Sequence, residues 1–236
     1  MRKKIHRFVG DFSFEEQTIL IADTKLAHQI ARVLRLVSGE MVDLVNKAGQ
    51  VARGEITSIT DRGVLVAIKE KFSAVTDAPV SVTLYLALLK REHFELAAQK
   101  ATEVGVAEIV PVITHRTVKL KLKLERVKKI ITESVEQSGR HTVPSISEPM
   151  SFSAALADAE RHDQIFLFDL DAPPFDSHGL SGKKIAIFIG PEGGWDAGEI
   201  EQAKAKNCTI VGLGHLTLRG ETAAILATYL AANPLD

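Results

Sequence analysis

Two apolar runs in the second half of the chain place the strongest constraint on its fold. Ile165–Leu170 and Ile185–Ile189 are short and lack the polar–apolar alternation of a half-exposed strand. Such runs are typical of strands buried on both faces, as in a parallel sheet. Helical and strand-like segments alternate around them, so the sequence predicts an α/β domain with a mostly parallel sheet.

The remaining elements of this domain follow from spacing and from capping residues. Gly105 fits the end of one helix, and Asp196 with Glu199 fits the capping box at the start of another. Further strands are expected at Val82–Leu89, Glu108–Ile113 and Thr209–Leu213. Helices are expected at Glu92–Val104, Leu124–Ser138, Asp196–Lys206 and Glu221–Ala232.

The first 72 residues have a different pattern. A short helix is expected over Asp23–Leu36, capped by Asp23 or Thr24. Strand-like runs follow, separated by turns that contain glycine, at Met41–Val45, Gln50–Ile59 and Val64–Ile68. Short strands with one helix indicate a small β-barrel. Ser73–Pro79 resembles a linker, so we expect one domain at residues 1–72 and a second at 73–236.

Composition excludes several classes of protein. A single cysteine, Cys208, allows no disulfide framework and makes a zinc cluster unexpected, so we expect no metal site. The chain has no stretch long enough to span a membrane and no signal peptide, so a soluble cytoplasmic protein is expected. The formal net charge is -1, but residues 1–140 hold 23 basic and 17 acidic residues, against 6 and 13 in residues 141–236. That asymmetry indicates a basic face for a polyanionic partner, or merely an uneven solvated surface.

Two glycine-rich loops follow buried strands near the C-terminus. The first is Gly190-Pro191-Glu192-Gly193-Gly194, and the second runs from Gly212 to Gly220 and opens the last helix. Ligands of open α/β sheets bind at the carboxyl ends of strands, and glycine lets a ligand approach the main chain. Each loop alone could also be an ordinary strand-to-helix connection.

Spacing excludes the common nucleotide sites but does not identify the ligand. The segment Gly212-x-Gly214-x-x-Thr217 lacks the third glycine of a dinucleotide fingerprint and lies near the end of the chain. No phosphate-binding loop of the Walker type occurs. The residues therefore predict a small ligand held by two backbone loops, which disfavours an oxidoreductase and a conventional methyltransferase with an early glycine motif.

The two loops together resemble the SPOUT superfamily of knotted methyltransferases. The pattern Leu213-Gly214-x-x-x-Leu218-Arg219-x-Glu221-Thr222-Ala223 carries this resemblance along with Gly190–Gly194. Other segments are similar to the bacterial ribosomal small subunit methyltransferase E family: Arg7-Phe8, His28 with Val33-Leu34-Arg35, Gln99–Val106 and Glu136–Arg140. The chain departs from the family in having Gly220 where a β-branched residue is usual.

The resemblance implies an S-adenosylmethionine-dependent enzyme that methylates N3 of a uridine in 16S ribosomal RNA of the 30S subunit. It implies a PUA-like N-terminal β-barrel, a C-terminal domain with a trefoil knot, and a homodimer. The cofactor residues that it implies are Phe168, Asp169, Ile189, Gly190, Pro191, Glu192, Gly193, Gly194, Leu213, Gly214, Leu216, Leu218, Arg219, Thr222 and Ala223.

Catalytic and RNA-binding residues are hypotheses from charge and position. Arg219 is expected to stabilise negative charge on the base, and Glu192 or Glu221 to accept a proton or face the sulfonium; both glutamates could instead brace loops. The expected RNA-binding residues are Arg7, Arg32, Arg35, Arg116, Lys119, Lys121 and Arg140. The lysines could equally protect a strand edge. A non-catalytic RNA-binding or ribosome-assembly protein is the alternative function, as is a SPOUT enzyme for another RNA.

Overall fold

The computed structural model describes residues 5–46, 48–72, 77–117, 122–178, 180 and 183–234. The chain divides into two compact units. The N-terminal unit comprises Met1–Asp77 and Val135–Val143, and the C-terminal unit comprises Ala78–Ser134 and Pro144–Asp236. The expected domain boundary after residue 72 stays a prediction, and part of the expected linker lies outside the described residues.

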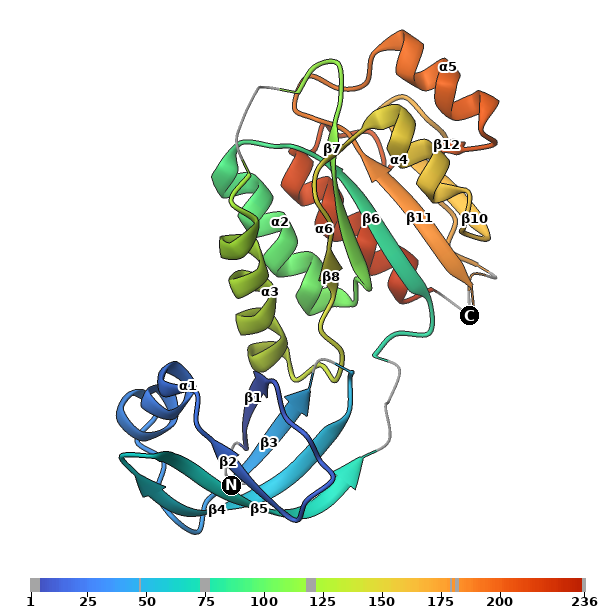
Figure 1. Cartoon of the computed structure of the whole chain (residues 1–236). Coiled ribbons are helices and arrows are strands. Elements are labelled where there is room, and N and C mark those ends of the chain that lie inside the picture. The colour runs from blue at the N-terminus through green and yellow to red at the C-terminus, as the bar shows by residue number, and fades with distance from the viewer. Residues whose placement is uncertain are drawn as a thin grey trace. The chain divides into compact units, whose positions relative to one another are not determined.

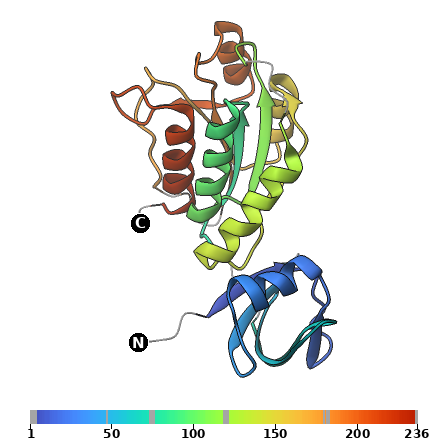
Figure 2. The same cartoon turned by 90° about the vertical axis from the view of Figure 1, so that its left-hand side faces the viewer.

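The N-terminal unit is built on one five-stranded sheet with the order β1-β3-β4-β5-β2 (Figure 1). Its strands are β1 (His6–Gly10), β2 (Thr18–Ile21), β3 (Met41–Asn46), β4 (Val51–Thr60) and β5 (Gly63–Phe72). β1 pairs parallel with β3 and the other ladders are antiparallel. Figure 2 shows the sheet strongly curled. Within the described residues no ladder joins the two edge strands, β1 and β2, so the predicted barrel is open there.

The predicted elements of this unit are present, with local differences. The three predicted strands correspond to β3, β4 and β5. The predicted helix is split into α1 (Thr24–His28) and the π-helical turn η1 (Gln29–Val33). The carboxylate of Asp23 caps α1 by accepting the Leu26 amide at 2.9 Å, as expected. β1 and β2 had not been predicted, because each is only four or five residues long and β1 is flanked by a basic terminus.

Residues 135–143 join the N-terminal unit through a buried ionic cluster. The carboxylate of Asp77 accepts the backbone amides of His141 and Thr142 at 2.8 and 2.9 Å, and the Thr142 hydroxyl. It also pairs with the Arg140 guanidinium at 3.1 Å, and the two side chains are 7 and 8% exposed. Burial raises the pKa of Asp77, but these donors outweigh burial and lower it to about 2.

Asp77 should therefore make folding stability depend on pH in the acid range. Its carboxyl titrates near 3.8 when unfolded and at about 2 when folded. The contribution is thus fully present above about pH 5 and is lost as the pH falls toward 2. The shift corresponds to about 2 kcal/mol. We expect Asp77→Asn to lower the free energy of unfolding at pH 7 and to flatten its decline between pH 5 and 2, measured by urea denaturation. An equally steep decline in the variant would contradict this role.

The C-terminal unit is an α/β domain with a parallel sheet in the order β12-β10-β11-β6-β7-β8, and β9 also pairs with β7. All of these ladders are parallel, as the apolar runs predicted. The strands are β6 (Ser81–Ala87), β7 (Glu108–Ile113), β8 (Ser145–Ile146), β9 (Met150–Ser151), β10 (Gln164–Phe168), β11 (Lys184–Ile189) and β12 (Thr209–Val211).

Helices cover both faces of this sheet (Figure 2). α6 (Gly220–Ala232) lies beside α2 (Arg91–Val104) and against β6 and β11, with α3 (Leu124–Ser138) on the same side. α4 (Phe152–Ala159) and α5 (Ala197–Ala205) cover the other face. There Tyr85 stacks on Phe188 with ring centroids 4.4 Å apart, and Phe152 packs edge-on against Phe188. The central strands are therefore apolar on both sides.

The sequence predicted four of these five helices. α2 ends at Gly105 in a left-handed conformation, and Asp196 with Glu199 forms the capping box of α5. α4 had not been predicted, although Ser151 caps it and Phe152, Ala155, Leu156 and Ala159 are buried at helical spacing. The signal was present, but the helix is only eight residues long and its composition of small residues gives weak periodicity.

Candidate functional site at the strand ends

A hollow of about 580 Å³ lies where β10, β11 and β12 end in the C-terminal unit. We call it the strand-end hollow. Its walls are the segment after β10, the Gly190–Trp195 loop after β11, and the segment from Leu213 to the first turn of α6. Three carboxyl ends of parallel strands thus meet at one site, as expected for a ligand site in an open α/β sheet.

Most of the residues predicted to hold a cofactor line this hollow together. They are Phe168, Asp169, Ile189, Gly190, Pro191, Glu192, Gly193, Gly194, Leu213, Gly214, Leu216, Leu218, Arg219 and Ala223. Thr222, the remaining one, lies in the first turn of α6 but does not line the hollow. Arg116, predicted to bind RNA, lines it instead and donates to the Gly193 carbonyl at 2.7 Å.

One buried indole fixes the shape of the first glycine loop. The Nε1 atom of Trp195 donates to the Phe168 carbonyl at 2.9 Å, which joins the loop after β11 to the end of β10. The Trp195 ring lies against Gly190, where an added Cβ would be 3.1 Å from the ring. Gly194 closes a tight turn by donating to the Pro191 carbonyl at 2.9 Å, with a φ of 70° that favours glycine. The loop is therefore held in one conformation before any ligand binds.

The second glycine loop crosses closely over the segment that follows β10. The Gly212 amide donates to the Pro173 carbonyl at 2.7 Å, and the Gly212 carbonyl accepts the Phe175 amide at 2.9 Å. A Cβ at Gly212 would lie 2.7 Å from the Ala172 carbonyl oxygen, which is closer than real Cβ contacts come. Glycine is thus required at position 212 because two backbone segments meet there.

Charged groups in the strand-end hollow are of both signs. Asp169, Asp171 and Glu192 are acidic, and Arg116 and Arg219 are basic. Arg219 occupies the N-cap position of α6, and its exposed side chain makes no capping hydrogen bond there. Its guanidinium is therefore available to a bound molecule. The hollow can accommodate a ligand that carries both a cationic and an anionic group.

Behind the hollow lies a polar cluster that the sequence analysis missed. His93 of α2 places its Nδ1 atom 3.6 Å from Oε1 of Glu192 and 3.7 Å from Oε2 of Glu221. Both His93 Nδ1 and Glu221 Oε2 are buried without a hydrogen-bond partner. Burial alone would raise the pKa of Glu192. The backbone amides of Glu192 and Lys90 and the His93 side chain lower this pKa by more than burial raises it, so it lies below its usual value.

Both separations of His93 Nδ1 are longer than a hydrogen bond, so the imidazole meets the two carboxylates through close polar contacts. His93 thus joins α2, the first glycine loop and the start of α6. Little in the sequence marks His93 as a site residue, because a histidine beside the apolar positions of a helix usually lies on a solvated face. Only the fold brings it to Glu192, which follows 99 positions later.

Gly220 occupies the position where the chain departs from the family pattern. A Cβ added there would lie 2.8 and 3.1 Å from the two terminal methyl groups of Leu89. Leu89 is 2% exposed and follows β6. The Leu89 side chain therefore occupies the space that a larger residue at position 220 would need, which gives the departure a packing explanation.

The expected RNA-binding residues have different surroundings. Arg32, Arg35 and Arg116 are exposed. The Arg7 side chain is 12% exposed; it pairs with Asp43 at 3.3 Å and donates to the Gly139 and Arg140 carbonyls. Arg140 is buried against Asp77. Arg7 and Arg140 therefore brace the N-terminal unit, and RNA binding by these two residues stays a prediction. Lys119 and Lys121 lie outside the described residues.

Other candidate chemistry is limited in the described part of the chain. No group of three His, Cys, Asp or Glu side chains there is placed to hold a metal ion. Cys208 is buried, which raises the pKa of its thiol to about 11, so the thiol is not a nucleophile near neutral pH. Among the described helices, none has the length and apolar character needed to cross a bilayer.

Comparison with known proteins decides the family. Residues 76–232 match the model of an RNA methyltransferase domain, and residues 23–69 match that of an RNA methyltransferase PUA domain. A Synechocystis protein named ribosomal RNA small subunit methyltransferase E is 31% identical over 220 residues, 90% of this chain and 72% of the relative. The chain belongs to the ribosomal RNA small subunit methyltransferase E family.

Further members of this methyltransferase E family agree over nearly the whole chain. The Rickettsia conorii protein of the same name is 30% identical and covers 90% of this chain and 88% of its own length. The crystal structure of the Neisseria gonorrhoeae family member bound to S-adenosyl methionine has a TM-score of 0.86 at 27% identity, with 95% of each chain covered. A Legionella pneumophila putative methyltransferase in complex with the same cofactor also scores 0.86, at 26% identity over 98 and 99% of the two chains.

The His93 ring should stabilise the site by lying between two carboxylates. We expect His93→Leu to lower the free energy of unfolding by about 1–3 kcal/mol, because it removes the polar group that faces the buried Glu221 Oε2 atom. His93→Gln keeps a side-chain hydrogen-bond donor and should recover part of this loss. His178→Leu removes an exposed His–Asp pair and serves as the control. Urea denaturation measures all three. Equal stability of His93→Leu and wild type would show that the cluster contributes nothing.

Proposed function

We propose that this protein transfers a methyl group from S-adenosylmethionine to N3 of a uridine in 16S ribosomal RNA of the small subunit. The observation that carries the proposal is the strand-end hollow, in which two glycine loops meet at three parallel strand ends in a chain of the methyltransferase E family. Family membership also supports an N-terminal RNA-binding domain at residues 1–72 and a catalytic domain at 73–236.

The residues of the strand-end hollow fit the proposed cofactor. Its volume, about 580 Å³, lies within the range of small-molecule sites. Apolar side chains such as Leu213, Leu218 and Ala223 offer a surface for the adenine ring, and loop backbone offers polar groups to the ring edge. Asp169 and Glu192 complement the cationic sulfonium and ammonium groups. When bound, the cofactor supplies an electrophilic methyl group.

Arg219 is proposed to stabilise the negative charge that develops on the base. As N3 of the base gains the methyl group and loses its proton, negative charge accumulates on the adjacent carbonyl oxygens. The Arg219 guanidinium lines the hollow and has no ion pair among the described residues, so it can stabilise that charge. Its place at the N-terminus of α6 fixes the backbone from which it reaches.

Glu192 is the proposed proton acceptor, and Glu221 is better suited to bracing. Glu192 lines the hollow and its side chain is 38% exposed, so a proton from N3 can reach it directly or through water. Glu221 does not line the hollow and its side chain is 7% exposed behind His93. We therefore propose that Glu192 receives the proton and that Glu221 holds the start of α6.

Replacement of Arg219 separates catalysis from cofactor binding. We expect Arg219→Ala to lower kcat by about 10²–10³, as for loss of one donor to a developing oxyanion. The dissociation constant for S-adenosylmethionine should change much less. Arg161→Ala, which removes an arginine outside the hollow, is the control. Single-turnover methylation and calorimetric titration measure the two quantities. Parallel loss of both in Arg219→Ala would contradict a catalytic role.

The proposed function has two direct tests. Mass spectrometry of ribosomal RNA from a strain that lacks this protein should show one missing N3-methyluridine, restored by the wild-type gene. Titration of the purified protein with S-adenosylmethionine should show binding. A protein that binds no S-adenosylmethionine and whose loss leaves the RNA unchanged would be a non-catalytic RNA-binding protein instead.

RNA contacts are proposed for the exposed arginines. Arg32 and Arg35 belong to the N-terminal unit and Arg116 to the rim of the strand-end hollow. Lys119 and Lys121 complete the proposed set. Removing a basic side chain that contacts a phosphate reduces the salt dependence of RNA binding. Lys119→Ala/Lys121→Ala with an unchanged salt slope would remove these two residues from the interface.

We propose that the protein is a homodimer, with an interface at the exposed apolar side chains of two adjacent helices. Leu96 of α2 and Leu226 and Tyr229 of α6 are 40, 41 and 52% exposed. Neighbouring exposed apolar residues favour burial in an interface. Light scattering should give twice the monomer mass for wild type and the monomer mass for Leu226→Glu/Tyr229→Glu. Leu20→Glu, at a 53% exposed position of β2, should remain dimeric. A monomeric wild type would contradict the proposal.

The family resemblance further implies a trefoil knot in the C-terminal unit. The close crossing of Gly212 over residues 172–175 supports this proposal. Mechanical unfolding from both ends should give a contour length shorter than the fully extended chain, because a knot retains residues. A full-length extension would contradict it.

A further inference from the structure

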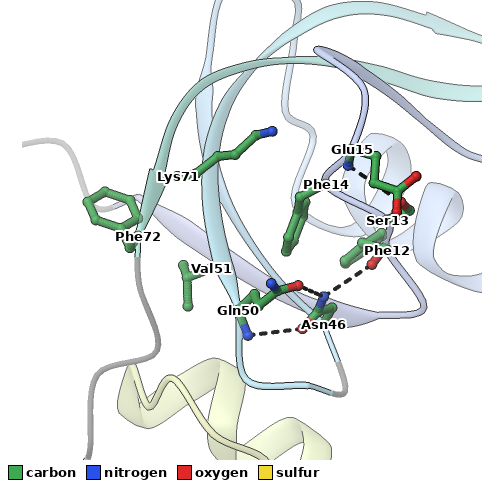
Figure 3. Close-up of a pocket in the computed structure, with 9 residues that line it drawn as sticks. All are labelled: Phe12, Ser13, Phe14, Glu15, Asn46, Gln50, Val51, Lys71 and Phe72. Carbon is green, nitrogen blue, oxygen red and sulfur yellow. Dashed lines mark hydrogen bonds between the residues drawn. The ribbon is translucent and has the colours of Figure 1, made fainter.

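The N-terminal unit contains a second hollow, of about 490 Å³, which none of the predicted site residues line (Figure 3). We call it the N-terminal hollow. It lies between the loop after β1, the β3–β4 turn and the end of β5. Its lining residues are Phe12, Ser13, Phe14, Glu15, Asn46, Gln50, Val51, Lys71 and Phe72. Only part of it falls within the matched PUA segment, residues 23–69.

One buried amide holds two walls of the N-terminal hollow together. The Asn46 side chain is 8% exposed as a residue and accepts the amides of Ala48 and Gln50 at 3.0 and 2.9 Å. Its Nδ2 atom donates to the Phe12 carbonyl at 3.3 Å and to Gln50 Oε1 at 2.8 Å. The β3–β4 turn and the loop after β1 are thereby tied to each other. The hollow is preorganised, which reduces the cost of ordering on binding.

The lining offers aromatic faces and hydrogen-bond donors. Phe12 and Phe14 stand on one side, and the Lys71 side chain extends from β5 over the hollow (Figure 3). The ring of Phe72, the next residue of β5, points away from them on the other side of the strand, where Arg53 lies 5.3 Å from the ring centroid. Within the described residues, no ion pair is found for Lys71, and Gln50 Nε2 has no hydrogen-bond acceptor.

These groups match one class of ligand. Bases stack on aromatic side chains, carboxamides pair with base edges, and lysine pairs with phosphate. Glu15, also in the lining, disfavours a free anion but can accept from an amino or imino group of a base. A duplex cannot present a base face to this hollow.

We propose that the N-terminal hollow binds one unpaired nucleotide of RNA, with its base against Phe12 and Gln50 and its phosphate at Lys71. The site would anchor a single-stranded nucleotide of the substrate apart from the one that is methylated. This inference rests on the proposed action on RNA and adds a site to it.

The test compares two variants of the hollow with a matched control. Lys71→Gln removes the charge, and Phe12→Leu keeps apolar bulk but removes the aromatic face. Lys69→Gln makes the same charge change on the same strand, where Lys69 pairs with Glu55 at 2.9 Å outside the hollow. Fluorescence anisotropy measures the affinity of the full chain for a 16S RNA fragment with unpaired nucleotides and for a fully paired duplex of equal length.

We expect Phe12→Leu to weaken binding of the fragment by about 5- to 100-fold, the range for loss of one stacked base. Lys71→Gln should also weaken binding of the fragment and reduce its dependence on salt, because a phosphate contact is lost. Binding of the duplex should change less than twofold, as should binding of the fragment by Lys69→Gln. All variants should bind S-adenosylmethionine as wild type does and unfold at a similar temperature.

Equal losses in Lys71→Gln and Lys69→Gln would overturn the site, because they would indicate general electrostatics. Unchanged affinity in both hollow variants would overturn it too. If wild type still methylates the ribosomal RNA in either case, the proposed function stands without this site. If wild type binds S-adenosylmethionine but neither RNA, both proposals fail.

Discussion

The hydrogen bond from the Trp195 indole to the Phe168 carbonyl connects the fold of this protein to its site. It joins the segments that leave β10 and β11, which are neighbours in the parallel sheet. The donor is buried, so losing its acceptor would cost about 1–3 kcal/mol. With this bond in place, the first glycine loop forms a wall of the strand-end hollow. The second loop is positioned separately, by the contact of Gly212 with residues 172–173.

The C-terminal unit could be predicted from the sequence because its signals are local. Continuous apolar runs gave the buried strands, and Gly105 and Asp196 marked helix ends that the structure confirms. Strands β1 and β2 could not be predicted in this way. They are short, and what makes them strands is pairing with β3 and β5, which lie far along the chain.

The site was only partly predictable for the same reason. Glycine loops after strands are a sequence signal, and they contain most of the residues that line the strand-end hollow. The meeting of His93 with Glu192 and Glu221 is a product of tertiary structure. Charge alone also did not show that two candidates for RNA binding, Arg7 and Arg140, are each paired with a buried aspartate, Asp43 and Asp77. Pairs of this kind are formed by tertiary structure, so the sequence does not indicate which basic residues have an internal acid.

The contact between Gly220 and Leu89 links two positions that are 131 residues apart in the chain. Because the Leu89 methyl groups fill the volume beside Gly220, a larger side chain at 220 requires the Leu89 side chain to shift or to be smaller. The two positions therefore form a size-compensating pair, although one follows a strand and the other begins a helix. Grafting a loop with a larger residue at 220 into this protein would have to provide for Leu89 as well.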